Sequence, residues 1–392
     1  MSACGTKRTV FRKSLAVRSP VLRHPRHIQG SYGYGPEAPN SRSGIGWRAA
    51  AGELIEKPWS LLLADQSNQM QGLTGSNYLR GVVYGLSAVC IWGAFIVVSR
   101  LGVRTSLTPW DVAAIRFAVA GVLLLPYLLR RGLALDRLGW TGFAAIVVGC
   151  GAPMVLLVNV GLLFAPASHG GAMFPGVMPL MVAILAAMIL KEAFTLQKTS
   201  GLILIVLGAV GIVWASSGTV GTRQNVGHLL FLCAGLAWAG YTVAMRRARL
   251  DGLHAAAISA VSSLVLYLPV YAIVDRTSLL KAPLFDVALQ AVVQGILTAI
   301  VALLLYGRMV GILGATGGAA FVALTPVITA LLGIPVLREW PSTIDWIAIT
   351  LISLGVYLVS GGPLPARRTR HKHEDREGAW PNRPTLAAGP RQ

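Results

Sequence analysis

One stretch of this chain occurs twice, and that duplication constrains the fold more than any other feature. Residues 174–214 contain two apolar segments joined by a charged turn, and residues 321–361 repeat the arrangement 147 positions later without a gap. An internal repeat of this kind shows that a domain has been duplicated, and the fold must accommodate both copies. The matched features are Pro179 and Pro326, Lys191-Glu192 and Arg338-Glu339, and LIVLG at 204–208 and LISLG at 351–355.

The similarity extends beyond this stretch. ASHGGAMF at 167–174 aligns with GATGGAAF at 314–321, with four of eight positions identical. A looser echo at an offset of 146 relates Gly81, Trp92 and Arg100 to Gly227, Trp238 and Arg246. These matches predict two homologous halves, at 79–216 and 227–360.

The composition places both halves in a membrane. Hydrophobic residues make up 54% of the chain, charged residues only 12%, and the mean hydropathy is +0.64, whereas soluble domains carry about 25% charged residues. A helix of about 20 apolar residues crosses the hydrocarbon core of a bilayer. Ten such helices are expected, at 79–98, 112–129, 139–163, 171–190, 199–215, 227–245, 255–274, 285–306, 314–337 and 345–360.

The basic residues predict the orientation of these helices. The formal charge of +19 is concentrated at helix ends and in the terminal segments, which favours membrane topology over binding of nucleic acid. Alternate connections and the C-terminal tail hold 14 Lys and Arg residues, against 6 in the opposite set. The positive-inside rule therefore predicts that both termini are cytoplasmic. Since each half has five spans, an odd number, the halves are expected to form two inverted five-helix repeats.

The terminal segments differ in composition from the apolar core. Residues 1–78 are rich in Arg, Ser, Gly and Pro and contain neither a spanning segment nor a secretory signal. They are expected to form a disordered basic extension. Translation starting at Met70, or an organellar transit peptide ending near Gln29, would each explain that composition. Residues 361–392 are expected to form a polar, basic tail.

Motifs for catalysis and for cofactors are absent. The cysteines at 4, 90, 150 and 233 have no metal-binding spacing, and no nucleotide-binding or hydrolase motif occurs. The acids of the core lie at span edges or in turns, so they do not predict the clustered groups that a membrane enzyme needs. Neither enzymatic activity nor a cofactor or metal is expected.

The doubled unit of a proline, an apolar span, a glutamate in the turn and an apolar span with a late glycine resembles the EamA branch of the drug/metabolite transporter superfamily. The opening segment IWGAFIVVSRLGVRTSLTPWDVAAIRFAVAG at 91–121 is also similar to that family. The resemblance covers about 79–360. It implies ten helices in two inverted halves, and export or exchange of small metabolites.

Several residues inside the spans are candidates for function. Pro179 and Pro326 are expected to act as hinges or, alternatively, to form packed kinks. Arg116 is expected to extend toward the interface or to pair with Asp111. Glu192 and Glu339 are expected to serve as turn and helix-start residues. Candidate substrate-binding residues are Trp92, Asn159, His169, Tyr241, Gln294, Tyr306 and Thr325.

These observations favour a secondary transporter that exports or exchanges amino-acid-like or drug-like solutes by alternating access. Its partners are a small-molecule substrate and the lipid bilayer of the inner cell membrane, and a homodimer is possible. A membrane-embedded transferase and a transport-inactive scaffold or receptor are the alternatives. His169 is interpreted as a loop histidine or as a proton-coupling group. Without a mid-membrane carboxylate, any proton coupling is expected at His169 or an edge acid; otherwise the protein is a passive exchanger.

Overall fold

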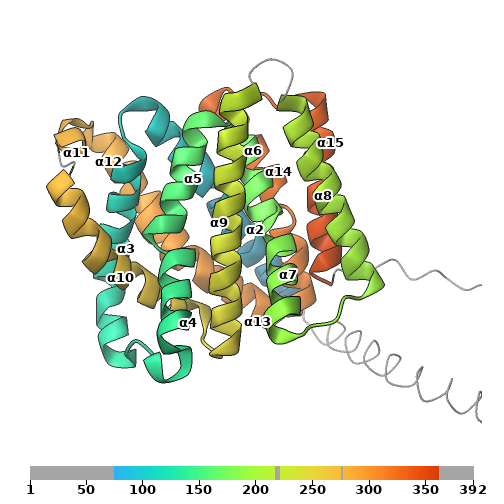
Figure 1. Cartoon of the computed structure of the whole chain (residues 1–392), viewed down its shortest axis with the longest axis horizontal. Helices are drawn as coiled ribbons and strands as arrows, with labels where there is room; N and C mark the ends of the chain where they lie inside the picture. Colours follow the sequence, from blue (N-terminus) through green and yellow to red (C-terminus); the bar gives the residue numbers. More distant parts are fainter. Residues whose placement is uncertain (1–74, 217–220, 275–276, 362–392) are drawn as a thin grey trace, which may run out of the picture. The chain divides into compact units, whose positions relative to one another are not determined.

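The computed structural model describes residues 75–216, 221–274 and 277–361. Met70, the predicted extension up to residue 74 and the tail after residue 361 lie outside these residues. Every regular element in the described part is helical (Figure 1). The elements are α2 (Gly75–Thr105), α3 (Pro109–Arg131), α4 (Leu135–Cys150), α5 (Ala152–Phe164), α6 (Ala167–Gly171), η1 (Ala172–Gly176), α7 (Met178–Leu190), α8 (Leu196–Ser216), α9 (Gly221–Arg247), α10 (Gly252–Val274), α11 (Thr277–Lys281), α12 (Leu284–Gln290), η2 (Ala291–Val301), α13 (Ala302–Val322), α14 (Thr325–Leu337) and α15 (Thr343–Val359).

The helices have the length and composition of membrane spans. Nine helical stretches within the described residues are long and apolar enough to cross a bilayer, and α15, with 17 residues, is apolar but shorter. Large apolar side chains face outward, such as Leu129 at 77% exposure and Ile273 at 85%. An apolar exterior of this kind suits lipid rather than water. The predicted all-helical membrane fold is confirmed, whereas the tenth crossing stays a prediction.

Two of the predicted spans are broken rather than continuous. The span predicted at 171–190 consists of α6, the π-helical turn η1 and α7, and the turn at Val177 separates the last two. A second turn separates α13 from α14. Pro179 and Pro326 each occupy the second position of the helix that follows the turn. The helix is thus interrupted just before each proline, and the role of these prolines as hinges or packed kinks stays a prediction. In the first helical turn the missing proline N–H removes no helical hydrogen bond.

Glycine conformation explains two further differences from the predicted spans. The span predicted at 139–163 is divided into α4 and α5 at Gly151, whose backbone is extended. The loop expected between 306 and 314 is absent, because the chain stays helical up to Gly314, where φ is +76° and ψ is +171°. Only glycine adopts such a conformation at low cost, so one residue makes the turn.

The two halves pack through matching helices. α3 packs against α10, and α8 packs against α15, so the second and fifth helices of the halves pair with their counterparts. In Figure 1, α8 and α15 lie side by side along one edge of the bundle. α2 of the first half packs against α14, and α9 of the second half packs in the same way against α7. The first helix of each half therefore packs against the fourth span of the other half.

Repeat-related glycines allow α8 and α15 to approach closely. A Cβ atom on Gly355 would lie 2.6 Å from the carbonyl oxygen of Gly201, and one on Gly208 would lie 2.7 Å from that of Ala348. Helices in lipid associate through close packing, because no hydrophobic effect drives them together. Gly208 and Gly355 therefore allow the close approach of α8 and α15.

Replacing Gly355 with alanine is expected to destabilise the protein. The added methyl group meets backbone atoms of α8, and overpacking of this kind costs about 1–3 kcal/mol. Thermal unfolding of the detergent-solubilised protein measures the effect, with Gly240→Ala as the control, because a Cβ atom there meets nothing within 4 Å. Equal unfolding midpoints for the two variants would show that the α8–α15 contact is loose.

Candidate functional site

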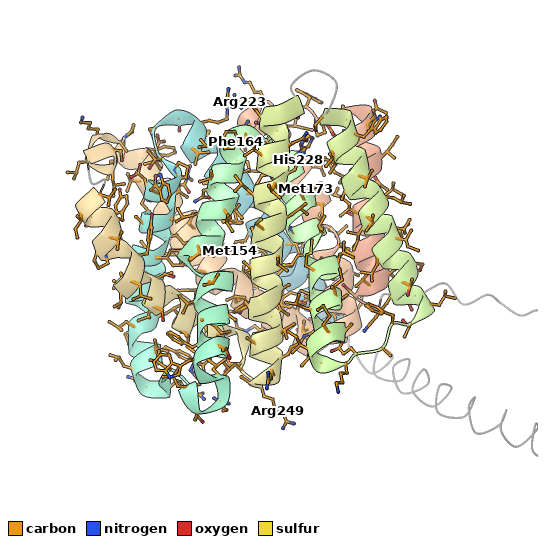
Figure 2. All side chains as sticks on the ribbon, viewed as in Figure 1. Met154, Phe164, Met173, Arg223, His228 and Arg249 are labelled. Atoms are coloured by element: carbon orange, nitrogen blue, oxygen red, sulfur yellow. The ribbon has the colours of Figure 1, made fainter. Side chains whose placement is uncertain are left out.

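Two histidines and an aspartate form a buried cluster near one end of the bundle. His169 lies in α6, His228 in the second turn of α9, and Asp345 in the first turn of α15. The His169 Nδ1 atom is 3.0 Å from His228 Nε2, and its Nε2 atom is 3.0 Å from Asp345 Oδ1. The three residues are between 2% and 8% exposed. Figure 2 places His228 toward the same end of α9 as Arg223, and Arg249 marks the opposite end. We refer to these three residues as the histidine cluster.

Local sequence explains how the cluster is held. Ser342 caps α15, and its backbone N–H donates to Asp345 Oδ2 at 2.8 Å, which leaves Oδ1 directed to His169. The expectation of a loop histidine at 169 is wrong, because α6 begins two residues earlier and buries the imidazole ring between the two halves.

Glu339 anchors the start of α6 beside this cluster. Its Oε1 atom accepts from Arg100 Nε at 2.9 Å and from Arg104 at 3.0 Å, and its Oε2 atom accepts from the Ala167 N–H at 2.8 Å. Arg100 also donates to the carbonyl oxygen of Leu162. A carboxylate suits the N–H groups exposed at the beginning of a helix. Glu339 therefore joins α2, α6 and the turn before α15.

The repeat places a second ion pair between the equivalent elements. Arg246 of α9 lies 3.5 Å from Glu192, which follows α7, and Lys198 lies 3.7 Å from the same carboxylate. The Arg246 and Glu192 side chains are 48% and 41% exposed, whereas those of Arg100 and Glu339 are 13% and 15% exposed. The equivalent pairs thus differ in burial.

Both glutamates lie in turns, as expected, but not at helix starts. Lys191 and Arg338 end α7 and α14 in the left-handed conformation, with φ of 56° and 55°. The glutamates come next, and α8 and α15 begin only several residues later. Their side chains therefore bind arginines of the other half instead of capping the following helix.

A second polar group lies in the interior around Arg116. Arg116 is 7% exposed, and its guanidinium group donates to Gln294 Oε1 at 3.2 Å and lies 5.1 Å from the centre of the Phe95 ring. Gln294 in turn donates to Ser99 Oγ at 2.7 Å and to the Phe95 carbonyl oxygen at 3.2 Å. No carboxylate within the described ranges lies within ion-pair distance of this guanidinium.

The expectation that Arg116 extends toward the interface or pairs with Asp111 is wrong. Asp111 instead forms a capping box with Thr108 and accepts from Tyr271 and Ser278. Those contacts occupy its carboxylate, so the arginine points into the bundle.

The remaining predicted residues contact neighbouring side chains and backbone groups. Trp92 packs against Tyr306 with ring centres 5.3 Å apart, and Tyr241 packs against Trp238 at 5.0 Å. Asn159 donates to the carbonyl oxygen of Pro109. Its own oxygen and the Thr325 hydroxyl are buried without a hydrogen-bond partner in the described part of the protein.

Sequence reasoning missed two members of the histidine cluster. His228 lies near the start of the span predicted at 227–245, and Asp345 is an acid at the edge of the span predicted at 345–360. Each falls within the first two turns of an apolar helix, and an ionisable residue in that position is a candidate for function. Their proximity to His169 could not be inferred, because it depends on the packing of three helices from both halves.

Comparisons with known proteins agree with the fold. The EamA-like transporter family matches residues 79–214 and 225–361. The inner membrane transporter YedA of Escherichia coli K12, whose function is uncharacterized, is 28% identical over 70% of this chain and 91% of its own length. The uncharacterized transporter YyaM of Bacillus subtilis is 26% identical over 65% of this chain and 85% of its own length.

A solved crystal structure is similar in fold, with a TM-score of 0.50 and 17% identity over 72% of this chain and 96% of that chain. This likeness concerns the fold alone. The family match covers both homologous halves of the chain over most of their length. The chain therefore belongs to the EamA-like transporter family and is a multi-pass inner membrane transporter.

Proposed function

We propose that this protein is a secondary transporter that exports or exchanges small metabolites by alternating access, with ten spans in two inverted repeats. Helix direction supports the inverted relation. Arg100, near the C-terminal end of α2, binds Glu339, which caps the segment that carries His169, and His169 contacts His228 near the N-terminal end of α9. The equivalent helices α2 and α9 therefore run in opposite directions.

The observation that carries the proposal is the unequal burial of the two equivalent ion pairs. Arg100–Glu339 is part-buried at one end of the bundle, at 13% and 15% exposure, and Arg246–Glu192 is exposed at the other, at 48% and 41%. In an inverted repeat the same contact is made twice, once on each side of the membrane. A carrier that is closed on one side and open on the other would have one of these ion pairs tightly packed and the other loosely packed.

The positive-inside count predicts which side of the membrane each ion pair faces. With both termini in the cytoplasm, the Arg100–Glu339 pair faces outward and the Arg246–Glu192 pair faces the cytoplasm. The described conformation is then closed to the outside. A membrane-embedded transferase and a transport-inactive scaffold are the alternatives, and neither requires the two pairs to open in turn.

Arg116 supports a substrate that carries a carboxylate, as an amino-acid-like solute does. A buried guanidinium is always charged and presents five N–H donors, and an unpaired charge within the membrane is costly. A carboxylate accepts two parallel hydrogen bonds from arginine. An anionic group that reaches Arg116 would supply the missing counter-charge.

Locking either ion pair is expected to stop transport. The double variants Arg100→Cys/Glu339→Cys and Arg246→Cys/Glu192→Cys, with the native cysteines replaced by alanine, are joined by a reducible bifunctional thiol reagent. Efflux from proteoliposomes loaded with a polar metabolite extract is followed by mass spectrometry. Either cross-link should lower efflux to that of protein-free vesicles, and reduction should restore it, because each lock holds one state of the cycle.

Efflux that persists through both cross-links would show that the pairs do not gate the pathway. If the unmodified protein moves no solute in either direction, the scaffold alternative is favoured.

The proline variants Pro179→Ala and Pro326→Ala are expected to bias the carrier in opposite directions. Alanine permits a continuous helix through the turns before α7 and α14, and even about 1.4 kcal/mol changes a two-state ratio about tenfold. The native Cys150, which lies midway along the span formed by α4 and α5, serves as the probe once the other cysteines are replaced. Its labelling from the two sides of the membrane should change in opposite senses. Shifts in the same sense, or none, would exclude these prolines as hinges.

Arg116→Gln is expected to weaken transport of carboxylate-bearing solutes selectively. A hydrogen bond to a charged group contributes about 1.5–3 kcal/mol, which corresponds to a loss of about tenfold or more. The exposed Arg130 on the same helix provides the control Arg130→Gln. Efflux of carboxylate-bearing and uncharged solutes from the same vesicles is compared. An equal loss for both classes would indicate a structural role for Arg116.

A further inference from the structure

The histidine cluster has hydrogen-bonding capacity for one more proton. A carboxylate oxygen only accepts, so His169 Nε2–H donates to Asp345 Oδ1. Two arrangements satisfy the contact between His169 Nδ1 and His228 Nε2: either His228 donates to a neutral His169, or a protonated His169 donates to His228. These arrangements differ by where protons reside and need no movement of heavy atoms.

The atom that would receive the proton is identified by its lack of a partner. The Nδ1 atom of His228 is buried and, within the part of the chain that the structure describes, has no hydrogen-bond partner. When both histidines are neutral and Asp345 is ionised, the cluster carries a buried net negative charge. Burial disfavours a net charge, and one proton makes the cluster neutral overall.

We propose that the histidine cluster binds a single proton and is the ion-coupling site of the transporter. The proton forms an N–H bond at His228 Nδ1, and His228 then donates its Nε2–H to His169 Nδ1. Transfer of that second proton leaves His169 as the imidazolium next to Asp345, and His228 as the neutral ring. The coupling role rests on the transport function proposed above, whereas proton binding does not.

The charges around the cluster leave Asp345 as the carboxylate that the histidines face. Glu339 bonds the first residue of α6, but its charge is matched by Arg100 and by the half-exposed Arg104 of α2. Arg223, at the start of α9, is exposed. Three further elements, α5, η1 and α14, pack against α6. None of them contains a charged residue. Of these carboxylates, Asp345 is the one that contacts a histidine of the cluster.

The site is built across the two halves and occurs once. His169 belongs to the first half, and His228 and Asp345 belong to the second. By the repeat offsets of 147 and 146, their counterparts are Thr316, Val82 and Lys198, which cannot form such a cluster. A proton at this contact changes how strongly the halves are joined at one end only, which is what coupling to alternating access requires.

The test measures each histidine without a substrate. Exchange of the imidazole C2 hydrogen with deuterium, followed by mass spectrometry across a pH series, reports the titration of individual histidines in the full-length protein in lipid nanodiscs. His169 and His228 are expected to share one titration step. Asp345→Asn should lower its midpoint by about one pH unit or more, because removing an opposite charge disfavours the imidazolium.

His254 provides the matched control. It is buried to a similar degree, at 3% exposure, and bonds the Gly132 carbonyl oxygen at 2.9 Å, so Asp345→Asn should leave its titration unchanged. Independent midpoints for His169 and His228, or midpoints that do not respond to Asp345→Asn, would overturn the proposal. Thermal unfolding of Asp345→Asn and of His228→Gln confirms that these variants are folded.

A transport measurement then separates coupling from binding. His228→Gln should abolish solute accumulation driven by a pH gradient while solute exchange at equal pH continues. Gradient-driven accumulation that survives His228→Gln would overturn the coupling role. If the protein moves no solute, the proposed function fails, and the histidine titration still decides whether the site binds a proton.

Discussion

Polar groups that this chain places in hydrocarbon need partners in the protein or in a water-filled cavity, because lipid offers none. That constraint accounts for the outward-facing apolar side chains and for the inward position of Arg116, Gln294 and the histidine cluster. It also explains why the turns next to Pro179 and Pro326 lie inside the bundle, where backbone groups released by a broken helix can be satisfied by neighbouring protein.

The two copies of the duplicated unit make equivalent ion pairs that differ in exposure. Glu192 and Glu339 follow equivalent left-handed residues and bind equivalent arginines, yet one pair is exposed and the other is part-buried. The backbone conformation before each glutamate does not distinguish the two turns, since Lys191 and Arg338 are both left-handed. In the proposed function, the difference reflects how closely the two halves approach at each end of the bundle.

The two polar groups in the interior occupy different places and suit different tasks. The histidine cluster connects the halves near the part-buried Arg100–Glu339 pair, where the proposed proton would act on their contact. Arg116 is held by Gln294, Ser99 and the aromatic ring of Phe95, away from any carboxylate in the described ranges. A division between an ion site and a substrate site follows from the proposed function.

The sequence by itself determined the membrane class, the duplication, most span positions and the family, because apolar length and repeated motifs are properties of the linear chain. It also indicated His169 as a candidate functional residue and the paired glutamates as equivalent positions of the repeat. Only the tertiary structure decided that His169 is buried between His228 and Asp345, that Arg116 turns inward, and that Pro179 and Pro326 begin helices. Each of these outcomes depends on which helices meet and on which partners are already occupied. Asp111 is unavailable to Arg116 because Thr108, Tyr271 and Ser278 engage it, and no pattern along the chain records such competition.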